Sequence, residues 1–146
     1  MKTNVYFRMN DGDEDLAPSK AHHDDAGYDL RSNTEITLPP GVVRLVPTGL
    51  YLELPCGFEA QVRPRSGLAL KHGVTILNSP GTIDAGYRGE VGVIMLNTLS
   101  EPFMIERGAR IAQMVIQKLP EVELVPAAML ADSRRGAGGF GSTGHN

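Results

Sequence analysis

Short runs of strand-forming residues, cut by glycine and proline, constrain the fold of this chain more than any other feature. Between Glu35 and Val62 the runs last only a few residues each and are separated by Pro39-Pro40-Gly41, Thr48-Gly49 and Pro55-Cys56-Gly57. Proline lacks the backbone donor that a central strand needs, and glycine adopts turn conformations without steric cost. Several short strands at this spacing are typical of a sandwich or barrel. We therefore expect an all-β domain.

One short helix is expected inside this β-rich pattern, between Ser66 and Gly73. Ser66 is a good N-cap, the leucine, alanine and lysine residues that follow favour helix, and Gly73 suits the position after the last helical turn. Strands are expected again at 74–77 and, to close the fold, around Glu121 to Val125. Pro126 marks the end of that last strand.

Composition and charge exclude several classes of protein. The chain has 146 residues, which suits one domain, and a formal net charge of -3. This charge argues against general nucleic-acid binding, because such proteins usually carry a basic face that neutralises phosphates. The single Cys56 cannot form an internal disulfide, which favours a reducing compartment. The apolar runs are far shorter than the roughly 20 residues of a membrane span, and the N-terminus lacks a signal-peptide core, so we expect a cytoplasmic protein without membrane contacts.

A tight hairpin with one carboxylate at its tip is expected between Asn78 and Gly89. Pro80-Gly81 ends the preceding strand, and Gly86 is expected to supply a positive φ in the turn. The hairpin would hold Asp84 rigidly, as a general base requires. Asp84 could instead bond the local backbone, as aspartate often does at turns, and Tyr87 could simply pack across the strands.

Pro64-Arg65-Ser66-Gly67 lies where the helix begins, and free backbone amides and the helix dipole favour an anion there. Arg65 can donate a forked pair of hydrogen bonds, Ser66 offers a hydroxyl, and Gly67 lets a phosphate oxygen approach the backbone. The alternative is a plain helix cap with a surface arginine. This tetrapeptide alone does not decide between the two.

Two charged stretches near the N-terminus suggest no chemistry. The acidic loop from Asp11 to Asp15 is expected to be merely solvated. His22-His23-Asp24-Asp25 places two imidazoles beside two carboxylates, but adjacent side chains point in different directions and no further ligands follow at zinc spacing. Metal binding by this cluster is therefore disfavoured.

The composition changes after residue 131, so we expect a β-barrel domain over 1–131 and a flexible glycine-rich arm over 132–146. Such ends are usually mere disorder. Phe140 makes that account incomplete, because a lone aromatic ring among glycines could stack on a planar base while Arg135 and Ser142 contact phosphates. Fully extended at about 3.3 Å per residue, the arm could reach roughly 50 Å, enough to cross onto another subunit.

Five segments together resemble, in order, the five motifs of trimeric dUTPases. They are Ala26-Gly27-Tyr28-Asp29-Leu30, Pro64-Arg65-Ser66-Gly67-Leu68-Ala69, Gly81-Thr82-Ile83-Asp84-Ala85-Gly86-Tyr87-Arg88-Gly89, Arg110-Ile111-Ala112-Gln113 and Arg135-Gly136-Ala137-Gly138-Gly139-Phe140-Gly141-Ser142-Thr143-Gly144. The resemblance implies a jelly-roll-like β-barrel of the β-clip type and a homotrimer with active sites at the subunit interfaces. It also implies hydrolysis of dUTP to dUMP and pyrophosphate, which keeps uracil out of DNA and supplies dUMP for thymidylate synthesis.

The resemblance assigns roles within the hairpin. Asp84 matches the aspartate that activates the water attacking the α-phosphorus. Thr82 and Ile83 belong to the backbone that reads uracil, and Asn78 matches a polar residue that also contacts the base. Tyr87 matches a tyrosine whose ring packs on deoxyribose and leaves no room for a 2′-hydroxyl.

The resemblance also assigns the triphosphate contacts. Arg65, Ser66 and Gly67 match a phosphate-binding segment supplied by a neighbouring subunit, and Gln113 matches a further phosphate or water contact. A divalent ion, usually Mg²⁺, would be held mainly by triphosphate oxygens and reached through water from Asp29.

The arm would close as a lid. Arg135, Phe140, Gly141 and Ser142 are the arm residues implied to contact substrate, with Phe140 over the uracil ring. Closing the lid would exclude water other than the nucleophile. The sequence leaves open whether the arm closes over its own or a neighbouring subunit's site.

The fourth motif departs from the family pattern, because Ala109 replaces a common acidic residue before Arg110. The partners of Arg110 and Arg107 are therefore in doubt, although activity is expected to survive. A dCTP deaminase shares the fold and the aspartate hairpin, but that family has a catalytic glutamate where this chain has Ile94 and usually a tryptophan where it has Tyr87. A non-catalytic nucleotide-binding module is a further alternative, against which the intact aspartate argues.

Overall fold

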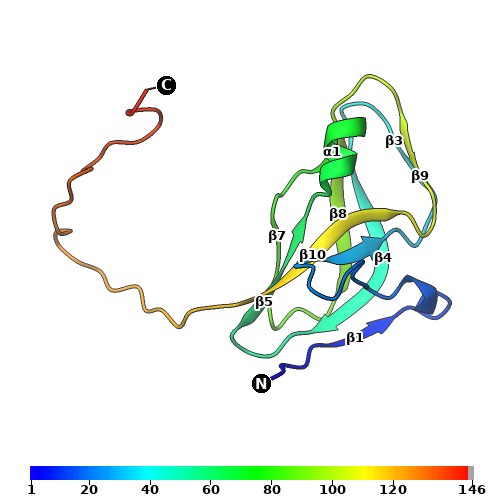
Figure 1. Cartoon of the computed structure of the whole chain (residues 1–146), viewed down its shortest axis with the longest axis horizontal. Helices are drawn as coiled ribbons and strands as arrows, with labels where there is room; N and C mark the ends of the chain where they lie inside the picture. The colour runs from blue at the N-terminus through cyan, green and yellow to red at the C-terminus, as the bar shows by residue number, and fades with distance from the viewer. Residues whose placement is uncertain (145–146) are drawn as a thin grey trace.

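Two four-stranded antiparallel sheets and a two-stranded ribbon build the body of the protein, in a computed structural model that describes residues 1–144 (Figure 1). The sheets have the strand orders β1-β4-β8-β6 and β2-β10-β5-β7, and the ribbon pairs β3 with β9. The strands are β1 (Tyr6–Met9), β2 (Tyr28–Arg31), β3 (Ile36–Leu38), β4 (Val43–Glu53), β5 (Phe58–Arg63), β6 (Val74–Ile76), β7 (Gly81–Ile83), β8 (Glu90–Asn97), β9 (Phe103–Ile105) and β10 (Arg110–Lys118). The expected all-β class is confirmed, although the sheets do not join into a closed barrel over the described residues.

The core lies between the inner faces of the two sheets, because side chains alternate along each strand. In β8, Val91, Val93 and Met95 are buried, whereas the residues between them face outward and are only half-buried. The buried cluster draws on both sheets and contains mainly leucine, valine and isoleucine. This alternation explains why short strands suffice, since each strand has to contribute only two or three apolar side chains.

Within residues 1–144 there is one α-helix, α1 (Ser66–His72), which connects β5 to β6, and one turn of 3-10 helix, η1 (Glu14–Leu16), follows β1. Gly73 ends α1 in the left-handed conformation, with φ of 59°, as expected. The N-cap prediction was wrong by one residue: Arg65 is the N-cap, and Ser66 is the first helical residue. Arg65 makes no side-chain capping hydrogen bond, so the first turn keeps its backbone donors free. No helix in the described part of the chain is long and apolar enough to cross a membrane.

The strand expected at Glu121 to Val125 does not form, because the chain leaves the body after β10 as an extended arm, orange to red in Figure 1. Val122, Leu124 and Val125 are 73–95% exposed. A strand needs a neighbouring strand to satisfy its backbone groups, and this part of the arm lies beside none of the chain's own strands. The exposed arm thus begins before the change in composition at residue 132, and the expected boundary there stays a prediction.

Asn97 is a buried polar residue that ties β8 to two loops. Its Nδ2 atom donates to the carbonyl oxygens of Leu38 and Glu101, at 3.0 and 2.7 Å, and its Oδ1 atom accepts from the Leu99 amide at 3.0 Å. Its side chain is fully buried; the bond to Leu38 is buried, and the bonds to Glu101 and Leu99 are part-buried.

We expect Asn97→Leu to lower the free energy of unfolding by about 3 kcal/mol, because one buried and two part-buried backbone groups would lose their partners. Urea denaturation followed by circular dichroism measures this loss. Asn4→Leu, at an exposed position, is the control and should change stability by less than about 0.5 kcal/mol. Equal stability of the two variants would contradict a structural role for Asn97.

Candidate active site

The hairpin between β7 and β8 carries the candidate catalytic carboxylate. β7 pairs with β5 and ends at Ile83, so Asp84 is the first residue of the turn, where its side chain is exposed. The turn is closed by the Tyr87 amide, which donates to the Asp84 carbonyl at 3.1 Å. The prediction of a positive φ at Gly86 was wrong. Asp84 to Tyr87 form a four-residue turn, and the common form of such a turn has negative φ at both central residues.

A cavity of about 180 Å³ lies against this hairpin. The residues that line it include the predicted base, sugar and catalytic contacts, together with the adjoining part of β8; they are Val62, Ile76, Asn78, Gly81, Thr82, Ile83, Asp84, Tyr87, Glu90, Val91, Gly92, Val93 and Ile94. Tyr87 is held at the rim, where its hydroxyl donates to the Glu90 carbonyl at 2.8 Å. The five site residues predicted in this part of the chain therefore share one cavity, as the hairpin pattern indicated.

A second cavity, of about 320 Å³, lies at the start of α1 beside β2 and β10. Its lining residues are Ala21, Asp25, Ala26, Gly27, Asp29, Arg65, Ser66, Gly67, Arg110 and Gln113. The Gln113 Nε2 atom donates to the Pro64 carbonyl at 2.9 Å, which holds this side chain beside the helix start. All the predicted phosphate contacts outside the arm therefore lie together.

Asp29 organises the charges of this second cavity. Its Oδ1 atom lies 3.8 Å from Nε of Arg65, and its Oδ2 atom lies 3.6 Å from Nη1 of Arg110. Arg65 also donates from Nη1 to the Arg110 carbonyl at 3.1 Å. The guanidinium groups of Arg65 and Arg110 line this cavity together with the carboxylates of Asp25 and Asp29, and the free backbone amides at the start of α1 supply further hydrogen-bond donors. This arrangement suits a polyanion.

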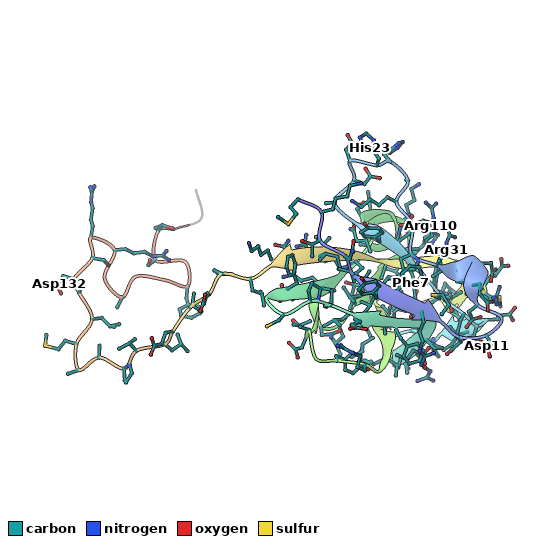
Figure 2. The ribbon with its side chains drawn as sticks, turned by 90° about the horizontal axis from the view of Figure 1, so that it is seen from below. Phe7, Asp11, His23, Arg31, Arg110 and Asp132 are labelled. Atoms are coloured by element: carbon teal, nitrogen blue, oxygen red, sulfur yellow. The ribbon has the colours of Figure 1, made fainter. Side chains whose placement is uncertain are left out.

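The two cavities share no lining residue, and the arm, as far as residue 144, lines neither of them. In Figure 2, Asp132 lies far from Arg110 and from the rest of the body. Within the arm, Arg135 Nε donates to the Gly138 carbonyl at 2.7 Å, and Phe140 is fully exposed. One subunit thus carries the cavity of about 180 Å³ beside Asp84, the cavity of about 320 Å³ at the start of α1, and an arm that extends away from both. The predicted site residues form three groups that a single copy of the chain does not bring together.

Among the described residues, no group of three or more histidine, cysteine, aspartate or glutamate side chains could hold a metal ion. His23 and Asp24 approach each other only to 3.9 Å, with both side chains almost fully exposed. Asp29 is the one carboxylate of the predicted site that lines the cavity at the start of α1, and both of its ion pairs are longer than 3.5 Å. A hard divalent cation there would need most of its oxygen ligands from a bound anion and water.

A family model described as dUTPase matches residues 14–144. The chain belongs to the dUTPase family. A relative from Solibacter usitatus, named deoxyuridine 5′-triphosphate nucleotidohydrolase, is 60% identical over 131 residues, which cover 88% of each protein. A relative of the same name from Clostridioides difficile is 52% identical over 132 residues, covering 90% of this chain and 92% of its own.

Solved dUTPase structures share the fold. The chain matches the dUTPase of Staphylococcus bacteriophage 80alpha with dUPNHPP at a TM-score of 0.89 and 27% identity, over 99% of this chain and 100% of that one. It matches a mutant dUTPase of phage phi11, described with a structural Mg(II) ion, at a TM-score of 0.79 and 24% identity, over 87% and 98% of the two chains. These likenesses confirm the expected jelly-roll-like architecture.

Sequence reasoning missed the role of the acidic loop, which is not merely solvated. Arg107 donates to both carboxylate oxygens of Asp15, at 3.0 and 2.9 Å, and to Asp13 at 3.1 Å. These contacts anchor the turn between β9 and β10, which leads directly into Arg110. In this member of the dUTPase family the doubt raised by Ala109 is therefore resolved: Arg107 pairs with the acidic loop, and Arg110 pairs with Asp29.

The ion pair makes stability depend on pH. The pKa of Asp15 lies below its ordinary value of 3.8, because hydrogen bonds and the charge of Arg107 favour the carboxylate. A pKa that is lower in the folded state stabilises the fold above about pH 4, and this contribution is lost as the pH falls through the folded-state pKa.

We expect Asp15→Asn to lower Tm slightly near neutral pH, and the difference from the unmodified protein to shrink as the pH falls through the lowered pKa of Asp15. Differential scanning fluorimetry across this pH range measures both effects. Asp11→Asn is the matched control, since Asp11 lies in the same exposed loop and its side chain makes no hydrogen bond or ion pair to the described residues. A difference in Tm that persists at the lowest pH would rule out the ion pair as its cause.

Proposed function

We propose that this chain is a dUTP diphosphatase, which hydrolyses dUTP to dUMP and pyrophosphate by attack of water on the α-phosphorus. The observation that carries the proposal is the shared cavity of Asp84, Asn78 and Tyr87 in a chain of the dUTPase family. Relatives that are 52–60% identical are named for this activity. We further propose that the enzyme acts in the cytoplasm, where it keeps uracil out of DNA and supplies dUMP for thymidylate synthesis.

Recognition of uracil is assigned to the backbone of β7 (Gly81–Ile83). This strand is at the edge of its sheet, so its outward donors and acceptors have no partner strand. The cavity beside it suits a single pyrimidine ring better than a purine. Cytosine would present its donors and acceptors in the wrong order and leave buried groups unpaired, which disfavours it strongly. Asn78 would add a side-chain contact to the base, and Tyr87 would pack on the sugar.

Catalysis is assigned to positioning and charge neutralisation, with Asp84 as the general base. Proton abstraction by such a base typically contributes a factor on the order of 10² to 10⁴. Arg65, the Ser66 hydroxyl and the amide of Gly67 would neutralise the charge that develops on the phosphates, with Gln113 beside them. A Mg²⁺ ion bound by the triphosphate, with Asp29 reached through water, would supply further charge neutralisation.

A homotrimer explains why the two cavities are separate. The outward face of β4 and β8 is apolar, with Val43 and Leu45 opposite Leu96 and Ile94, and Val43 and Leu45 are 44% and 65% exposed. Ile94 also lines the Asp84 cavity, so a second copy seated on this face would lie beside that cavity. Joining the Asp84 cavity of one copy to the phosphate cavity of another is a head-to-tail contact, which closes into a ring when the rotation permits. We propose three subunits and three such sites.

The arm is proposed to be the lid of this site. Arg135 would contact the phosphates, Phe140 would stack on uracil, and Gly141 and Ser142 would contribute close contacts from the surrounding turn. The exposed apolar residues of the arm, between 122 and 130, support docking onto another surface, because single chains rarely expose so many apolar side chains together.

Pyrophosphate release from dUTP, compared with UTP, dTTP and dCTP, tests the proposed function directly. We expect release from dUTP alone at low substrate concentration. No release from any of the four would favour a non-catalytic binding module. Conversion of dCTP to dUTP with loss of ammonia would reveal a deaminase.

We expect Asp84→Asn to reduce kcat by a factor on the order of 10² or more while changing dUTP affinity only a few-fold, because the base is lost and the shape is kept. Single-turnover kinetics and isothermal titration calorimetry separate the two quantities. Asp11→Asn serves again as the control for loss of one exposed carboxylate. Full activity of Asp84→Asn would show that another group is the base.

We expect a chain that ends at Ala131 to lose tenfold or more in kcat/KM while keeping its Tm, because the lid contacts are lost and the core is untouched. Steady-state kinetics and thermal unfolding measure the two effects. Size-exclusion chromatography with light scattering provides the control on assembly. Loss of the trimer in the truncated protein would make the arm residues structural instead.

A further inference from the structure

The ring of Tyr87 is held in one orientation although it is 46% exposed. Its hydroxyl donates to the Glu90 carbonyl at 2.8 Å. Glu90 is itself anchored, because its Oε1 atom accepts from the Gly49 amide of β4 at 2.9 Å. The hydroxyl is therefore tied to a carbonyl that cannot move freely.

The ring also lies directly against Gly89. A Cβ atom at Gly89 would be 2.5 Å from the Tyr87 hydroxyl oxygen, 2.6 Å from Cζ and 2.9 Å from Cε2. Carbon atoms in van der Waals contact are about 3.5–4.0 Å apart, so a methyl group there would displace the ring by on the order of 1 Å. The ring occupies the space that any other residue at position 89 would need.

The backbone conformation at position 89 does not require a glycine. Gly89 does not have a positive φ, so an alanine could adopt its conformation. Gly86, three residues earlier in the same turn, also lacks a positive φ, and a Cβ atom there would meet nothing within 4 Å. The two glycines therefore differ in one respect: the presence of the Tyr87 ring.

We propose that Gly89 is a positioning residue for substrate specificity. Because Gly89 lacks a side chain, the Tyr87 ring can lie against the backbone of the hairpin. In this position the ring leaves room for a deoxyribose and excludes a 2′-hydroxyl. This inference rests on the proposed function, in which Tyr87 packs on the sugar. With a methyl group at position 89, the ring swings away from Gly89, its hydroxyl leaves the Glu90 carbonyl, and the sugar pocket loses its fixed wall.

The kinetic test compares Gly89→Ala with Gly86→Ala. We expect Gly89→Ala to reduce the ratio of kcat/KM for dUTP to kcat/KM for UTP at least tenfold, the range in which one misplaced apolar contact affects discrimination. Gly86→Ala should leave the ratio within about twofold of the unmodified protein. An unchanged ratio in Gly89→Ala would overturn the proposal.

A double-mutant cycle shows whether the effect passes through the ring. In a Tyr87→Leu background the aromatic ring is gone, so adding Gly89→Ala should produce little further change in the ratio. An equally large further loss in this background would mean that Gly89 acts through the backbone, contrary to the proposal.

A measurement without substrate separates this inference from the proposed function. The Hα protons of Gly89 should show a ring-current shift in the NMR spectrum that disappears in Tyr87→Leu and persists in Gly86→Ala. Absence of the shift in the unmodified protein would overturn the packing claim even if dUTP is hydrolysed. Presence of the shift in a protein that releases no pyrophosphate from dUTP would leave the packing intact and refute the proposed function.

Discussion

The pairing of β8 with β4 is the constraint on which the rest of the structure depends. Its register sets Val46 opposite Val93 and Leu45 opposite Ile94. Because side chains alternate, a slip of one residue would send the core face of β8 outward and its outward face into the core. The burial of Val93 and Met95 thus also determines that Ile94 borders the cavity beside Asp84. The strand β8 therefore contributes residues both to the core and to the wall of this cavity.

The cavity at the start of α1 depends on charge in the same way that the cavity beside Asp84 depends on packing. Asp29 comes from β2, Arg65 from the start of α1 and Arg110 from β10, so three separate elements meet at one carboxylate. Arg107, in the turn that precedes Arg110, forms an ion pair with Asp15 of the acidic loop and so fixes that turn. These ion pairs therefore position the guanidinium groups of Arg65 and Arg110 without burying them. Both groups stay accessible to an anionic ligand.

Sequence reasoning predicted the features that depend on local residues. The short strands, the helix that ends at Gly73, and the grouping of Asp84 with Tyr87 all follow from turn chemistry and alternation within a few residues. It could not find the contacts of Arg107 with Asp13 and Asp15, because 92 or more residues separate the partners and no spacing marks them. It also placed a strand at 121–125, where alternation is present and a pairing edge within the same chain is absent. The roles of the individual site residues still rest on family resemblance and proximity.

The arm that leaves the body after Lys118 would make the proposed lid closure a tethered event. A flexible tether of about 20 residues has a root-mean-square span on the order of 25 Å, which corresponds to a local concentration of its tip in the millimolar range. Contacts that would be too weak to hold a free peptide are sufficient at that concentration. The proposed closure on such a tether would be independent of how dilute the protein is, and weak individual contacts would let the arm open quickly after the reaction.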